Sequence, residues 1–183
     1  VKLNKNKISL RDANNYVLNE INKSKENIIT LSADLSSSTK VKINDSEFYS
    51  ATNRLGQNIA IGVREHAMGA IMNGLTLAGL RVCGSTFLVF SDYMRPSMRL
   101  AALSGLPVIY LLTHDSIAVG EDGPTHQPVE QLPGLRMVPN LNVFRPCNAT
   151  EVVWAWQRAL REEHKPSCIV LSRQRFVQIP TDR

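Results

Sequence analysis

One short stretch, GEDGPTHQP at residues 120–128, gathers several chemically capable side chains within nine residues. They are Glu121, Asp122, Thr125 and His126. Two prolines and two glycines surround them; proline fixes φ, and glycine accepts turn conformations that other residues avoid. The stretch is therefore expected to be a well-defined turn that holds carboxylates and an imidazole in fixed positions.

A second histidine, His114, precedes this turn and follows the apolar run LPVIYLLT at residues 106–113. Asp122 and the two histidines thus fall on one loop after a predicted strand, which favours acid–base or hydrogen-bonding work over core packing. The chain has no HExxH motif and no metal-ligand spacing. A Ser/His/Asp hydrolase stays open as an arrangement, although no GxSxG motif is present.

Glu65 stands at the start of a predicted helix at residues 64–80, which is rich in glycine and alanine. A carboxylate there either complements the helix dipole or shares a proton with a ligand nitrogen, a task that requires desolvation. Phe87, Phe90 and Tyr93 recur every three residues in a stretch expected to be helical. Such a stripe is either core or a stacking wall for a flat heterocycle.

Arg11, Ser38 and Arg173 are far apart in the sequence, but each is expected at a helix start, a loop or a strand end. Two arginines and a serine that converge would hold a phosphate ester through charge-assisted hydrogen bonds. The alternative is that each arginine forms an ordinary surface ion pair.

The elements that must position these residues alternate between strand and helix. Apolar runs predict strands at 27–32, 57–63, 81–86, 106–113, 142–145 and 167–172, and periodicity predicts helices at 9–22, 64–80, 87–105 and 148–164, with a long loop at 36–56. Continuous apolar strands indicate a mostly parallel sheet covered on both faces, a three-layer α/β/α fold. Ligands bind such sheets at the carboxyl ends of the strands. Polar residues follow the predicted strands there: Asp34, Glu65, His114, Asp115 and Arg173.

Composition limits the class of protein. The 183 residues are 43% hydrophobic and 20% charged, which is typical of a globular domain with a real core. The net charge of +5 is partly spread over lysine-rich pieces near the start rather than a basic, aromatic patch, so no nucleic-acid partner is expected. The sequence shows no apolar run of 18 residues and no signal-peptide pattern, so no membrane association is expected. Three scattered cysteines favour a reducing compartment.

Five motifs together resemble the transketolase family. They are GVREHAMGAI (62–71), STFLVFSDY (85–93), THDSIAVGEDGPTHQPVEQLPGLRMVPN (113–140), FRPCN (144–148) and LSRQ (171–174). Other thiamine-diphosphate enzymes carry only looser versions of the long block. The resemblance implies a central pyrimidine-binding domain at residues 9–183, preceded at 1–8 by a linker from an N-terminal diphosphate-binding domain, with the C-terminal domain absent.

The resemblance implies thiamine diphosphate as cofactor, with Mg²⁺ (or Ca²⁺) held by the N-terminal domain and not by this chain. Glu65 is then the residue that pairs with a ring nitrogen of the aminopyrimidine. Phe90, with Phe87 and Tyr93 beside it, matches the aromatic surroundings of that ring. Asp34 in SADL matches an aspartate near the cofactor.

The same resemblance assigns the sugar phosphate substrate to this domain. The residues that match the phosphate-binding positions are Arg11, Ser38, His114 and Arg173. Ser38 is matched by spacing, and Ser36 and Ser37 are adjacent alternatives. Asp122 matches an aspartate that senses a sugar hydroxyl, and His126 a histidine near the reacting carbons; Glu121 is expected to be structural.

The resemblance implies transfer of a two-carbon ketol unit from a ketose phosphate to an aldose phosphate. It also implies a cytoplasmic homodimer of the pentose phosphate pathway, whose active site forms between this domain and the diphosphate domain of the other subunit. The isolated fragment is expected to be inactive. Two alternatives remain: a ketol transferase of the dihydroxyacetone synthase kind, and a non-catalytic interaction module.

Overall fold

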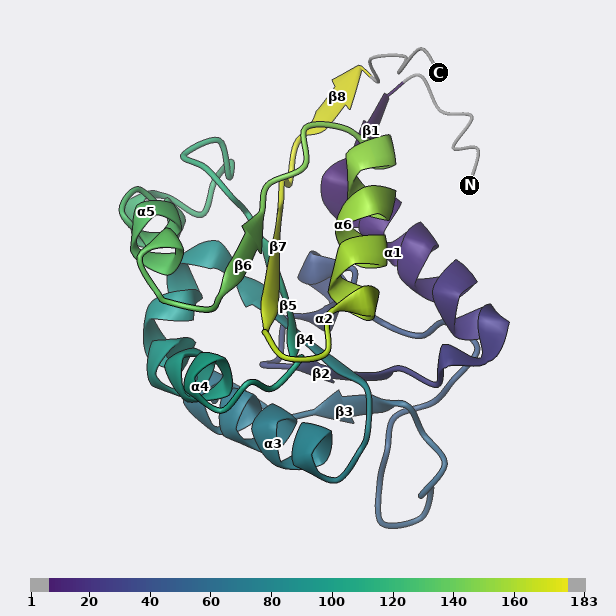
Figure 1. Cartoon of the computed structure of the whole chain (residues 1–183). Helices are drawn as coiled ribbons and strands as arrows, with labels where there is room; N and C mark the ends of the chain where they lie inside the picture. Colours follow the sequence, from purple (N-terminus) through teal and green to yellow (C-terminus); the bar gives the residue numbers. More distant parts are fainter. Residues whose placement is uncertain (1–6, 178–183) are drawn as a thin grey trace.

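A six-stranded, wholly parallel sheet forms the centre of the computed structural model, which describes residues 7–177 (Figure 1). Its strand order is β3-β2-β4-β5-β7-β6. The strands are β2 (Ile29–Ser32), β3 (Asn58–Ala60), β4 (Val82–Phe87), β5 (Ile109–Thr113), β6 (Asn142–Phe144) and β7 (Ser167–Leu171). The predicted strands and their parallel arrangement are therefore confirmed.

Helices cover both faces of this sheet, which confirms the three-layer α/β/α class (Figure 1). On β5, Tyr110 and Leu112 belong to the core that contains methionines of α3 (Glu65–Leu77) and α4 (Ser91–Leu103). Their neighbours Ile109 and Leu111 belong to the core shared with α1 (Leu10–Ile21) and α6 (Ala149–Arg161). This division follows from the two-residue alternation of side chains along a strand. The core between the sheet and helices α1 and α6 also contains a buried hydrogen bond of 2.7 Å from Trp156 Nε1 to Asn14 Oδ1.

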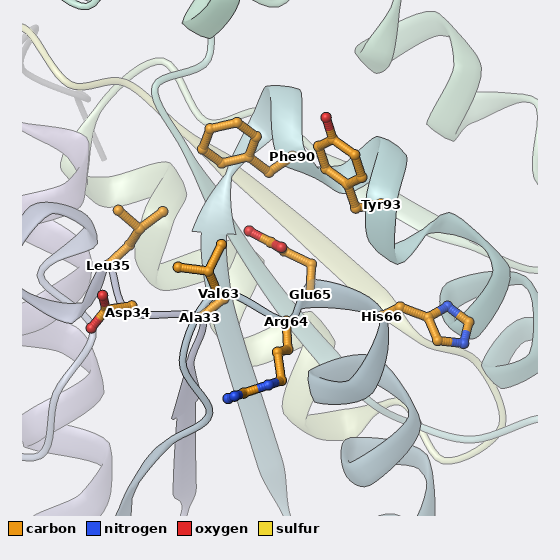
Figure 2. Close-up of a pocket in the computed structure, with 9 residues that line it drawn as sticks. All are labelled: Ala33, Asp34, Leu35, Val63, Arg64, Glu65, His66, Phe90 and Tyr93. Atoms are coloured by element: carbon orange, nitrogen blue, oxygen red, sulfur yellow. The ribbon is translucent and has the colours of Figure 1, made fainter.

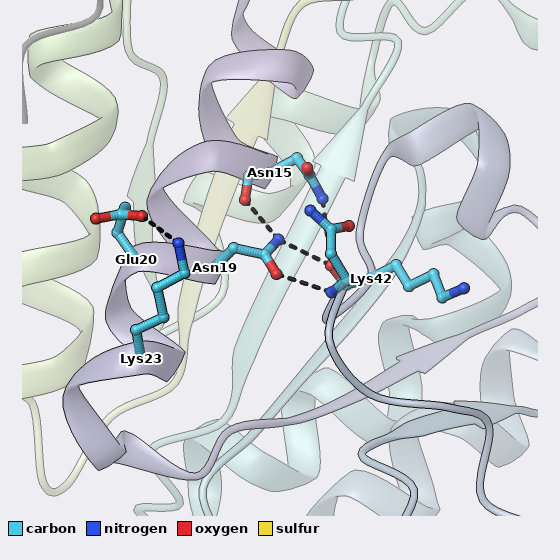
Figure 3. A network of polar contacts seen from close by, with 6 residues as sticks. Asn15, Asn19, Glu20, Lys23 and Lys42 are labelled. Carbon is cyan, nitrogen blue, oxygen red and sulfur yellow. Dashed lines mark hydrogen bonds and ion pairs between the residues drawn. The ribbon is translucent and has the colours of Figure 1, made fainter.

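The stretch expected to be a long loop, 36–56, begins with a short helix, α2 (Ser36–Thr39). The following segment is tied to α1 by side-chain amides (Figure 3). Asn15 Nδ2 donates to the carbonyl of Lys40 at 2.7 Å, and Asn19 Nδ2 donates to that of Lys42 at 3.0 Å. Asn19 Oδ1 accepts from the amide of Asn44 at 2.8 Å. These bonds satisfy backbone groups at Lys40, Lys42 and Asn44 that strand pairing leaves free; further along, Phe48 forms a single parallel bridge with Asn58 of β3.

The prediction of one helix over 87–105 is wrong at its start. Phe87 is the last residue of β4 and pairs with Thr113, and a 3₁₀ turn, η2 (Leu88–Phe90), precedes α4. Phe87 therefore has an extended backbone, with φ −74° and ψ 151°. The three aromatic residues come from a strand, a turn and a helix, so they do not form one helical stripe. Pro96 lies inside α4 without ending it.

The segments near the two described ends pair with each other. β1 (Lys7–Ser9) and β8 (Arg175–Val177) form an antiparallel ribbon, here called the β1–β8 ribbon (Figure 1). Lys7 and Ile8 fall in the segment expected to be a linker, yet Ile8 is only 4% exposed. The rest of that segment, 1–6, lies outside the described residues. Sequence periodicity also did not predict the short elements η1 (Asn22–Glu26), η3 (Pro124–His126) and α5 (Gln131–Arg136).

Candidate active site

A pocket of about 610 Å³ opens at the carboxyl ends of β2, β3 and β4 (Figure 2). It is lined by Ala33, Asp34, Leu35, Val63, Arg64, Glu65, His66, Phe90 and Tyr93. Each part of the lining comes from a segment that directly follows a strand, as expected for a doubly wound parallel sheet. This group is called the Glu65 pocket below.

Glu65 is the buried acid of this pocket, with only 7% of its surface exposed. It is the first residue of α3, where backbone N–H groups favour a negative charge. Its Oε1 accepts a hydrogen bond from Thr86 Oγ1 at 3.3 Å. Figure 2 shows the carboxylate pointing into the space between Val63 and Phe90. A carboxyl group shielded from water in this way can pair with a ring nitrogen that carries or receives a proton.

The aromatic residues divide between the wall of the pocket and its support. Phe90 and Tyr93 line the pocket, and Tyr93 is 67% exposed. Phe87 does not line it but stacks behind Phe90, with ring centroids 5.7 Å apart and planes 10° apart. It also stacks on His114, whose ring centroid lies at 3.6 Å, and contacts His126 edge-on at 6.1 Å. Phe87 thus connects the Glu65 pocket to a second group of residues.

Asp34 lies at the edge of the pocket and is exposed, in a left-handed backbone conformation with φ +63°. Aspartate is one of the few residues that tolerate this region, since its short side chain forms hydrogen bonds with the nearby backbone.

Ser38 lies one turn further on, in α2. Its carbonyl accepts a hydrogen bond of 2.7 Å from the Arg11 guanidinium, so the structure joins two residues that are distant in sequence.

His114 is the buried member of the second group, with 2% of its surface exposed and φ +58°. Its Nδ1 lies 2.8 Å from Thr113 Oγ1. Burial, reinforced by the positive charge of Arg11, lowers the pKa of His114 to about 4; Arg173 adds to this shift, and Asp122 opposes it. His114 is therefore a neutral hydrogen-bonding group at physiological pH.

The two predicted arginines lie close to His114. Burial lowers the pKa of Arg11, Asp12 opposes this, and Arg173 contributes to the lowering. The backbone N–H of Arg11 donates to the carbonyl of Ser172 at 3.3 Å, which places the start of α1 beside the end of β7. Gly120, at φ +89°, packs against Arg173: a Cβ added there would lie 3.3 Å from Nη1. The glycine thus allows the 120–128 turn to approach the arginine.

Asp122 and His126 complete this group from the turn; Asp122 is exposed, as is its neighbour Glu121, and His126 is half-buried. His126 is in η3 and contacts Phe90 edge-on, with ring centroids 5.3 Å apart. It also acts electrostatically on His114. The residues His114, Arg11, Arg173, Asp122 and His126 are called the charged rim below. His126 is the member that reaches the Glu65 pocket.

Comparison with known proteins decides the family. The sequence pattern of the family described as "Transketolase, pyrimidine binding domain" matches residues 6–178. The chain belongs to the transketolase family.

Curated and solved relatives agree with this assignment. The chain is 51% identical to a transketolase of Geobacillus stearothermophilus over 175 residues, which is 95% of this chain and 26% of the relative. A solved transketolase from Leishmania mexicana superposes with a TM-score of 0.95 at 42% identity, covering 100% of this chain and 28% of that one. A Pichia stipitis transketolase in complex with sedoheptulose 7-phosphate gives a TM-score of 0.92 at 39% identity, covering 96% and 27%. The chain spans about a quarter of the length of these transketolases.

The pocket suits the ring after which this transketolase domain is named. A pyrimidine is flat and carries ring nitrogens, and the pocket offers aromatic side chains beside a single buried carboxylate. Within residues 7–177, no group of three or more histidine, cysteine, aspartate or glutamate side chains is arranged to hold a metal ion. No described helix is both long and apolar enough to span a membrane.

Some contributors to the site were not found by sequence reasoning. Val63 and Leu35 line the pocket, but they are ordinary apolar residues. The one sequence signal for their role is that they stand close to Glu65 and Asp34 in the chain. Thr86, which donates to Glu65, is a buried strand residue with no chemical signature. The one sequence feature that could have indicated Thr86 is its position at the end of a predicted strand, where ligands bind such sheets.

Proposed function

We propose that this domain provides the pyrimidine site and the sugar-phosphate site of a transketolase. The reaction is transfer of a two-carbon ketol unit from a ketose phosphate to an aldose phosphate, with thiamine diphosphate as cofactor. The observation that carries the proposal is that the Glu65 pocket and the charged rim, which differ in chemistry, adjoin one another. The buried Glu65 carboxylate lies in an aromatic pocket, and Phe87 and His126 connect that pocket to the charged rim.

Glu65 would hold the aminopyrimidine by sharing a proton with a ring nitrogen. Phe90 and Tyr93 would pack against the ring, Phe87 would support Phe90 from behind, and Asp34 would lie at the pocket edge. Bound thiamine diphosphate supplies the nucleophilic carbon that takes up the two-carbon unit. Burial makes Glu65 suited to its part, because water is kept from competing for its hydrogen bond to the ring.

The charged rim would bind the sugar phosphate. Arg11 and Arg173 suit the phosphate, because guanidinium groups form bidentate, charge-assisted bonds to phosphate oxygens. Neutral His114 and the Ser38 region, held by Arg11, add hydrogen-bonding groups beside them. Asp122 would accept from a sugar hydroxyl. His126, which contacts Phe90, would serve the reacting end of the sugar.

Parts of the enzyme outside these 183 residues would supply the remaining groups. We place the diphosphate and its Mg²⁺ (or Ca²⁺) on another domain, in a homodimer where that domain belongs to the second subunit. The cytoplasm and the pentose phosphate pathway are the setting that we propose for this activity. The 183-residue stretch alone is accordingly expected to show no ketol transfer.

A ketol-transfer assay with xylulose 5-phosphate, ribose 5-phosphate, thiamine diphosphate and Mg²⁺ tests the proposal. It compares the natural protein that carries this domain, its Glu65→Gln variant and the 183-residue stretch. The expected result is an active natural protein, a disabled variant and a silent stretch. An inactive natural protein would instead support a non-catalytic module, and activity restricted to small unphosphorylated acceptors would support an enzyme of the dihydroxyacetone synthase kind.

A further inference from the structure

A third arginine, Arg175, lies beside the charged rim but belongs to none of the residues already assigned. It is the first residue of β8 and pairs with Ser9 in the β1–β8 ribbon. Ser9 caps α1, whose second residue is Arg11. Arg173 lies two positions before Arg175. The ribbon therefore brings the backbones of all three arginines to one place.

Among the described residues, no carboxylate forms an ion pair with these three arginines, although Asp12 and Asp122 attract Arg11 electrostatically. Asp12, the acid nearest in sequence, is held by the hydroxyl of Ser9 at 2.6 Å. Arginines on the surface of a protein usually lie among acids, and gathered like charges destabilise one another. A bound anion relieves that repulsion, so the arrangement favours one.

Arg175 acts electrostatically on one residue of the rim, Arg11. It helps to lower the pKa of Arg11, as Arg173 does. His114 is influenced by Arg11 and Arg173, but Arg175 is not among the groups that affect it. Arg175 is thus associated with Arg11, in agreement with the pairing of Arg175 with Ser9, two residues before Arg11.

We propose that Arg175 is a specificity residue that contacts the outer oxygens of the substrate's phosphate group and so favours phosphorylated over unphosphorylated sugars. The inference rests on the proposed function for the reaction, but its chemistry, recognition of a phosphate dianion by a third guanidinium, is its own. An exposed guanidinium gives a modest direct interaction and also raises the local concentration of anions.

The test compares KM for ribose 5-phosphate with KM for ribose in the natural protein that carries this domain. The variants are Arg175→Gln and Arg175→Lys. The matched control is Arg161→Gln, an exposed arginine in the last turn of α6, before β7 begins and thus at the opposite end of the sheet. Arg175→Gln should raise KM for ribose 5-phosphate about threefold at low salt and leave KM for ribose unaltered. Arg175→Lys should recover most of the loss, and higher salt should shrink the difference.

Equal KM values for ribose 5-phosphate in the wild type and Arg175→Gln would overturn the inference, as would equal losses for both sugars. Titration of both proteins with inorganic phosphate, followed by ³¹P NMR, separates this failure from failure of the proposed reaction. If the wild type transfers no ketol units, the reaction is wrong. The anion role of Arg175 then stands only if Arg175→Gln binds phosphate about threefold more weakly than the wild type and Arg161→Gln.

Discussion

The Glu65 pocket and the charged rim lie along the same edge of one sheet but solve opposite physical problems. The pocket places the buried carboxylate of Glu65 among aromatic and aliphatic side chains, with the exposed Asp34 at its edge. The rim gathers guanidinium groups, imidazoles and a carboxylate with little internal pairing. The two regions nevertheless meet closely: Phe87 and His126 both contact Phe90 of the pocket, and Phe87 also stacks on His114 of the rim.

The two regions also differ in how the chain builds them. The pocket uses residues that come after β2, β3 and β4, three strands that are adjacent in the sheet. The rim joins the start of α1, the loop after β5 and the end of β7. Changes in either region should therefore have separable effects, and the predictions below test this separation.

The largest effect is expected in the Glu65 pocket. Glu65→Gln keeps the shape of the side chain but cannot share a proton, so ketol transfer by the natural protein should fall by about 10²–10⁴-fold. Thermal unfolding should change little, because the amide can still accept from Thr86. Glu151→Gln, at the start of α6, is the control for a lost helix-start carboxylate. A Glu65→Gln variant as active as this control would return Glu65 to a helix-dipole role.

The next effect is a pH dependence that belongs to the rim. His114 has a folded pKa of about 4, below its ordinary value of 6.5. As pH falls below about 6.5, the unfolded chain takes up a proton that the folded chain refuses, so folding stability is lost until about pH 4. The loss is on the order of 2–3 kcal/mol.

Unfolding by urea at several pH values between 7 and 4 measures this loss in the natural protein. His114→Gln should remove the contribution, so that its stability falls less steeply over this window. His164→Gln, which replaces an exposed histidine, is the control and should follow the wild type. Identical slopes for the wild type and His114→Gln would contradict the assignment of a buried neutral imidazole.

A smaller effect should follow from Arg173→Gln. Loss of one charge-assisted contact should raise KM for phosphorylated sugars about tenfold, because such bonds are stronger than neutral ones. The effect on unphosphorylated sugars should be minor. Thiamine diphosphate affinity, measured by cofactor titration of the same variant, should stay at the wild-type value. A parallel loss of cofactor affinity would show that the pocket and the rim are not separable.

The smallest effect is expected at the residue that joins the two regions. Phe87→Leu removes a ring that stacks on both Phe90 and His114, at a cost of about 1 kcal/mol in folding stability. It should also weaken cofactor and sugar-phosphate binding together, each about twofold, through loosened support. Phe144→Leu, on the edge strand β6, provides a control: Phe144 does not line the Glu65 pocket, and none of the ring contacts given for the described residues involves it. An effect confined to one ligand would show that Phe87 supports only one region.

Much of the fold was predictable because the strands of the sheet are continuous apolar runs. LPVIYLLT and SCIVLS are buried on both faces and became β5 and β7. The boundary at Phe87 was not predictable, because the STFLVF stretch suits either a strand or a helix until its pairing with Thr113 is known. β1 and β8 are too short to show a period, and their pairing depends on contacts between opposite ends of the described chain.

The site was predictable in its composition but not in its layout. Strand-end polarity indicated Asp34, Glu65, His114 and Arg173, and the transketolase resemblance supplied their expected roles. Phe87 stacks on His114, and Gly120 approaches Arg173, only once the chain is folded. The spacing of these residues along the sequence does not predict such contacts. For the same reason, the sequence motifs gave no sign that Arg175 belongs beside Arg11.

The β1–β8 ribbon gives the rim a different kinetic character from the pocket. Its partner strands are separated by nearly the whole described chain and are only three residues long, so their pairing closes a very large loop with few hydrogen bonds. Such a unit opens by local unfolding at a lower free energy than the central sheet, and its amide protons exchange sooner. The ribbon contains no residue of the Glu65 pocket, so its opening should leave β4 and α3 protected from exchange.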